Sequence, residues 1–111
     1  MQFAKDIVDV LEEKKGEDIL LLDVRALSPF TDYFVICSGS SNRTVQALVE
    51  AVREMAHQSW QVASRVEGKP QDGWVLVDFG DVVVHTFSPD QRAYYQLEEL
   101  WREGRVVVRL K

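Results

Sequence analysis

Several features are scarce in this sequence, and each scarcity excludes a class of protein. Cys37 is the only cysteine among 111 residues, so no internal disulfide can form. No apolar run approaches the roughly 20 residues needed to cross a membrane, and the acidic N-terminal stretch is untypical of a targeting segment. No repeat or long linker divides the chain. We therefore expect one domain, residues 1–111, in a reducing compartment, most simply the bacterial cytoplasm.

Positive charge is also in short supply. The chain has 13 Lys plus Arg against 18 Asp plus Glu, which gives a formal net charge of −5. A negative protein repels phosphate backbones, so we expect no direct binding to nucleic acid. A basic protein partner fits this charge better.

The hydrophobic pattern that is present indicates one α/β unit. Apolar residues at helical spacing predict an amphipathic helix near the N-terminus and a central helix over about 42–58. Short apolar runs predict strands at 19–24 and 33–37, which are close enough in sequence to pair antiparallel. A weaker strand is expected between 61 and 66, before the turn-rich segment 67–73.

The stretch WVLVDFGDVVVHTF (74–87) is apolar but contains two aspartates and a histidine. Gly80-Asp81 interrupts it where a tight turn needs a residue that tolerates positive φ, which predicts a hairpin of two antiparallel strands. Ser88-Pro89 then favours the start of a last helix. The tail VVVRL (106–110) is interpreted as either a short extra strand or an ordered arm.

Three patterns could carry catalysis or hold a metal. The turn GSS (39–41) resembles the phosphate-binding turn of nucleotidyltransferases, but no carboxylate pair follows to hold Mg²⁺, so an N-cap is favoured. Asp78, Asp81 and His85 form a possible ligand set, yet the hairpin would place His85 about four residues up its second strand. Cys37 lies in an apolar strand and is expected to be a buried thiol. We expect no catalytic residue, metal or cofactor.

Trp74 opens a strand directly after a polar turn, and two interpretations of it stay open. The indole could cap the sheet as part of the core, or it could anchor an interface beside the carboxylates. The predicted last helix adds Tyr94, Tyr95 and Trp101 beside three glutamates. An acidic surface rich in aromatic side chains suits a basic protein partner.

Three blocks of the sequence resemble the ribosomal silencing factor family, also called the Iojap-like family. The blocks are DYFVICSGSSNRTVQAL (32–48), EGKPQDGWVLVDFGDVVVHTF (67–87) and RAYYQLEELW (92–101). The resemblance runs in order from about residue 3 to about residue 102. It leaves residues 103–111 as a C-terminal extension.

The resemblance implies a mixed sheet of about five strands flanked by helices, shaped like a nucleotidyltransferase without its catalytic carboxylates. It also implies a non-catalytic translational repressor that binds ribosomal protein fourteen of the large ribosomal subunit and blocks joining of the small subunit. Members of the family are often homodimers. The alternative is a nucleotide-binding or nucleotidyltransferase-like enzyme. The docking residues of the family fall here on Trp74, Val75, Asp78, Gly80, Asp81, His85 and Tyr94.

Overall fold

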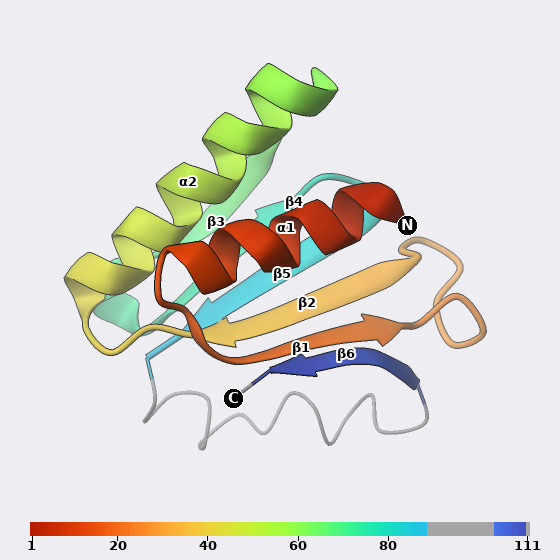
Figure 1. Ribbon diagram of the computed structural model, residues 1–111, viewed down its shortest axis with the longest axis horizontal. Coiled ribbons are helices and arrows are strands. Elements are labelled where there is room, and N and C mark those ends of the chain that lie inside the picture. Colours follow the sequence, from red (N-terminus) through yellow and green to blue (C-terminus); the bar gives the residue numbers. More distant parts are fainter. Residues whose placement is uncertain (89–103, 111) are drawn as a thin grey trace.

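The computed structural model describes residues 1–88 and 104–110. These residues form, in chain order, α1 (Gln2–Glu13), β1 (Glu17–Asp23), β2 (Tyr33–Ser38), α2 (Asn42–Trp60), β3 (Arg65–Lys69), the short 3-10 helix η1 (Pro70–Asp72), β4 (Trp74–Asp78), β5 (Val82–Phe87) and β6 (Arg105–Leu110) (Figure 1). The predicted last helix, with Tyr94, lies outside the described residues. None of the described helices is long and apolar enough to span a membrane.

The strands form one mixed sheet in the order β3-β4-β5-β2-β1-β6. β2 and β5 are parallel, whereas the other neighbours, including β1 with β2 and β4 with β5, are antiparallel. The expected α/β class and mixed sheet are therefore confirmed. The described residues contribute six strands, one more than the expected five, because the tail pairs with β1 along its outer edge.

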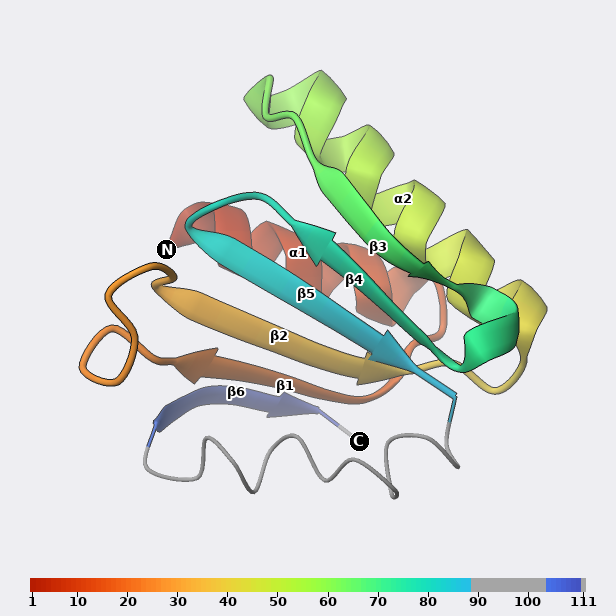
Figure 2. The same ribbon diagram turned by 180° about the vertical axis from the view of Figure 1, so that it is seen from behind.

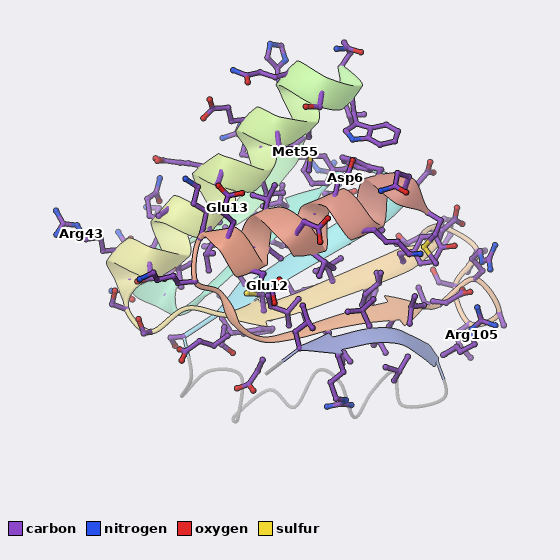
Figure 3. All side chains as sticks on the ribbon, in the orientation of Figure 1. Asp6, Glu12, Glu13, Arg43, Met55 and Arg105 are labelled. Atoms are coloured by element: carbon purple, nitrogen blue, oxygen red, sulfur yellow. The ribbon has the colours of Figure 1, made fainter. Side chains whose placement is uncertain are left out.

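The α-helices α1 and α2 lie on the same face of this sheet (Figures 1 and 2). α1 turns an apolar side toward the sheet, while Glu12 and Glu13 at its C-terminal end are exposed and Asp6 is half-buried (Figure 3). Each fully buried aliphatic side chain in this layer stabilises the fold by about 1.5–3 kcal/mol relative to exposure. The buried residues between helices and sheet include Ile7, Leu11, Leu21, Val35, Leu48, Val52, Val77 and Val84.

The opposite face of the sheet holds a second apolar cluster. Its members alternate along the strands with those of the first cluster, because successive side chains of a strand point to opposite faces. Every residue of β2 and β5 is buried, which explains their nearly continuous apolar sequences. The second cluster consists of Leu20, Leu22, Val24, Phe34, Ile36, Val83 and Phe87, with the half-buried Trp74 and Leu76 against it.

The predicted position of the third strand was wrong. The central helix continues to Trp60, and Gln61 ends it in a left-handed conformation with φ 51°, so β3 begins only at Arg65. The segment Glu67–Lys69, expected to form a turn, pairs with β4 instead. Gly68 permits this with a φ of +88°, and a Cβ there would lie 2.4 Å from the Trp74 carbonyl oxygen. Strand pairing therefore overrode the local turn preference.

Candidate functional site

Strand β4 places its alternate residues on the face of the sheet opposite the helices. Trp74, Leu76 and Asp78 share this face, each only partly buried. Their partners across the ladder on the edge strand β3 are Lys69, Glu67 and Arg65, respectively. We call these six residues the β3–β4 surface.

Trp74 contributes both to the second core cluster and to this surface. Its ring stacks on Phe87 with centroids 5.2 Å apart and planes inclined by 24°. Its indole N–H donates a hydrogen bond to Nδ1 of His85 over 3.3 Å. Together with Glu67, Gly68 and Leu76, the half-buried indole lines a cavity of about 180 Å³. The tryptophan is thus held in a defined orientation beside a small recess.

His85 lies almost wholly inside the protein, with 5% of its surface exposed. Burial lowers the pKa of its imidazole to about 4, so the ring is neutral near pH 7. Because Nδ1 accepts the indole N–H, the ring proton belongs on Nε2, and this buried atom has no hydrogen-bond partner among the described residues. Phe34 meets the ring edge-on at 5.1 Å. His85 therefore supports Trp74 from beneath the surface.

Asp78 closes β4 and holds the hairpin turn. One carboxylate oxygen accepts the Gly80 backbone N–H over 2.7 Å, and the other lies 3.3 Å from Nη2 of Arg65. Gly80 has a φ of +91°, and the Phe79 N–H donates to the Val82 carbonyl over 2.9 Å, so the predicted hairpin is confirmed. The Asp78 carboxylate is therefore a structural element of the turn as well as part of the surface.

Asp81 presents its side chain differently from Asp78. The residue is exposed at the tip of the turn, while its backbone carbonyl accepts the N–H groups of Asp32 at 2.9 Å and Tyr33 at 3.1 Å. The main chain of the turn is thereby fixed against the start of β2. The carboxylate remains available to interact with a partner in solution.

The remaining predicted residues divide between the core and the undescribed segment. Val75 is 1% exposed and faces the helices, so its side chain belongs to the core and not to the surface. Tyr94 falls outside the described residues.

The candidate ligand set is not assembled as a metal site. Asp78 and His85 share a face, but no hydrogen bond joins them. The described residues contain no group of three or more metal-ligating side chains.

Sequence reasoning missed five residues of the site, namely Leu76 of β4 and Arg65, Glu67, Gly68 and Lys69 of β3. Leu76 lies between Trp74 and Asp78 on the same face, and Glu67 and Gly68 line the cavity from β3. The two-residue period of a strand, counted from Trp74, would have identified Leu76. The contribution of β3 could not be found in the same way, because it depends on which strand pairs with β4.

The candidate phosphate turn has a structural explanation. Ser41 is the N-cap of α2, and its Oγ accepts the Thr44 backbone N–H over 3.1 Å, as predicted. A Cβ on Gly39 would lie 2.9 Å from Cγ2 of Val45, so glycine allows the close approach of the helix. Cys37 is fully buried, also as predicted.

Comparison with known proteins shows which family this sequence matches. The sequence matches a family model described as ribosomal silencing factor during starvation over residues 1–111. It is 46% identical over 93 residues to the ribosomal silencing factor of Bacillus subtilis, spanning 84% of this chain and 79% of that protein. A mouse protein named mitochondrial assembly of ribosomal large subunit protein 1 is 37% identical over 99 residues, covering 86% of this chain and 43% of its own length.

A solved structure resembles the whole fold. The X-ray structure of a protein from Chromobacterium violaceum superimposes with a TM-score of 0.86 at 37% sequence identity. The match covers 96% of this chain and 91% of that one. The fold of this chain is therefore shared with a solved protein that is also related to it in sequence.

Proposed function

Because this chain belongs to the ribosomal silencing factor family and is thus a ribosome-associated regulator of translation, we propose that it binds ribosomal protein fourteen of the large subunit and blocks joining of the small subunit. The name of the mouse relative, which refers to the large ribosomal subunit, supports the choice of subunit. The mechanism is steric occlusion in the cytoplasm and requires no catalytic group. Translation falls because whole ribosomes cannot form.

The orientation of Trp74 is the observation that carries this proposal. A half-buried indole, held by His85 and Phe87 beside a recess, has the geometry of an aromatic interface anchor. The exposed carboxylate of Asp81 and the net charge of −5 favour a basic protein over bare RNA. The docking site in this proposal is therefore the β3–β4 surface together with the turn at Gly80 and Asp81.

Co-sedimentation with isolated subunits tests the proposal. We expect the protein to sediment with large subunits and not with small ones, and prior addition should reduce the formation of whole ribosomes. Equal binding to both subunits would contradict docking on a large-subunit protein.

Two further measurements concern the free protein. Sedimentation without ribosomes reports whether it is a homodimer. Titration with Mg-ATP tests the enzymatic alternative, which micromolar binding would support.

Charge reversal separates the roles of the two turn aspartates. Asp81→Lys is expected to slow association severalfold and to flatten its salt dependence, because an exposed carboxylate steers a basic partner over a Debye length of about 8 Å. The free energy of unfolding of Asp81→Lys should change by only about half a kcal/mol.

Asp78→Lys should instead destabilise the fold by about 1–2 kcal/mol, since it removes the hydrogen bond to the Gly80 N–H and repels Arg65.

These outcomes are measured by association kinetics with the purified ribosomal protein across a salt series, alongside urea unfolding of each variant. An unchanged on-rate for Asp81→Lys would show that this carboxylate does not face the partner. An unchanged stability for Asp78→Lys would show that the turn does not depend on its carboxylate.

A further inference from the structure

Phe30 is the most exposed of the large apolar side chains in the described chain. It lies in the loop between β1 and β2 (residues 24–32) with 87% of its surface accessible, and Leu27 of the same loop is 39% exposed. Single apolar residues on a surface are ordinary, so exposure alone assigns no role. The surroundings of Phe30 are more informative.

The loop that presents Phe30 is ordered by its own hydrogen bonds. The Val24 N–H donates to the Asp32 carbonyl over 2.9 Å, which closes the loop at its base. Ser28 Oγ accepts the backbone N–H groups of Phe30 at 3.2 Å and Thr31 at 3.3 Å. Phe30 is thus displayed on a preformed turn, so the loop loses little conformational entropy when a partner binds.

The same loop is joined directly to the turn proposed for docking. The Asp81 carbonyl accepts the N–H groups of both Asp32 and Tyr33. Both views place the loop and the turn between β4 and β5 at the same end of the sheet (Figures 1 and 2). A partner that covers Gly80 and Asp81 therefore reaches the neighbourhood of Phe30 without any movement of the chain.

The charges beside Phe30 indicate the chemistry of that partner. Asp32 and Asp81 are both exposed, and the Asp32 N–H donates to the Asp81 carbonyl. The guanidinium of Arg25 lies 2.7 Å from the Asp23 carboxylate and holds the pKa of that group at about 2, so this basic charge is neutralised. Arg105, labelled in Figure 3, lies on the β6 side of the loop, where its charge acts on Asp23.

An exposed apolar ring in a loop that also carries an exposed carboxylate, and is bonded to a turn with another, fits an apolar recess flanked by Lys or Arg. A symmetric contact with a second copy of this chain would instead bring the carboxylates of Asp32 and Asp81 toward those of the other copy, which is unfavourable. These charges favour a basic protein as the occupant.

We propose that the loop between β1 and β2 forms a second point of contact with the large subunit, in which Phe30 enters an apolar recess of a basic ribosomal protein while Asp32 and Asp81 face its Lys or Arg side chains. This inference rests on the proposed function and extends the docking site beyond the β3–β4 surface. The two regions are connected through the hydrogen-bonded turn at Asp81.

The variant Phe30→Ser tests this contact in the full-length protein. We expect its affinity for isolated large subunits to fall by roughly 10-fold or more, as for a central aromatic contact, with no shift in the urea midpoint. Val106→Ser is the control for loss of an exposed apolar side chain, because Val106 is 47% exposed and pairs with Leu22 of β1, outside the loop. This control should bind like the wild type.

Each other outcome has a distinct meaning. If the wild type sediments with large subunits and Phe30→Ser binds equally well, the loop contact is refuted while the proposed function stands. If the wild type does not bind large subunits, the proposed function itself fails. A lower urea midpoint, or loss of self-association without loss of ribosome binding, would assign Phe30 to the fold or to a homodimer and would also overturn the inference.

Discussion

Trp74→Ala is expected to weaken binding to large ribosomal subunits by roughly 2 kcal/mol or more, which corresponds to about 30-fold in affinity. The truncation removes the indole from the β3–β4 surface and enlarges the recess that it lines with Leu76. It also leaves His85 without the indole N–H that donates to it, and it removes one of the rings stacked on Phe87. Some loss of stability will therefore accompany the loss of affinity, but the variant should still fold.

Two control variants distinguish these effects. Trp74→Phe keeps an aromatic ring against Phe87 but cannot donate to His85, so its affinity should lie between those of wild type and Trp74→Ala. Trp60→Ala removes a tryptophan of the helical side, which is 36% exposed and donates to Asp6, and it should bind normally. Subunit binding is measured together with circular dichroism. An unfolded Trp74→Ala would show that Trp74 is essential to the core and would refute its assignment as an anchor.

The stability of the protein is expected to fall by about 3 kcal/mol between pH 7 and pH 4 through His85 alone. Burial lowers the pKa of this imidazole to about 4 in the folded protein, whereas an unfolded histidine titrates near 6.5. Above pH 6.5 both states hold a neutral ring and the group contributes no pH dependence. As the pH falls toward 4 the unfolded state binds a proton that the folded state refuses, so the free energy of unfolding decreases by about 1.4 kcal/mol per pH unit.

Urea unfolding between pH 7 and pH 4.5 measures this dependence. His85→Phe should flatten the slope between pH 6.5 and 5, although its stability at pH 7 is lower because Trp74 loses its acceptor. His57→Gln, which replaces an exposed histidine of α2, is the control and should retain the slope of the wild type. An equal slope in wild type and His85→Phe would show that His85 does not titrate as its burial requires.

Features that depend on neighbouring residues could be predicted from the sequence. Ser41 caps α2 because its hydroxyl accepts an N–H three residues ahead, and Gly80 forms the hairpin turn because it tolerates positive φ. The apolar runs of β2 and β5 predicted both as strands, and every residue of the two is buried. The family resemblance likewise follows from blocks of consecutive residues, and the comparisons confirm it.

Only the tertiary structure decided which side chains meet and which remain exposed. The segment Glu67–Lys69 carries turn residues, but pairing with β4 made it part of a strand, and pairing with β1 made the tail a sixth strand. Val75 was expected at the docking surface and lies in the core, one strand position from the half-buried Trp74. The bond of Trp74 to His85 and the exposure of Phe30 depend on strand register and loop packing, which join residues distant in sequence and therefore leave no local pattern.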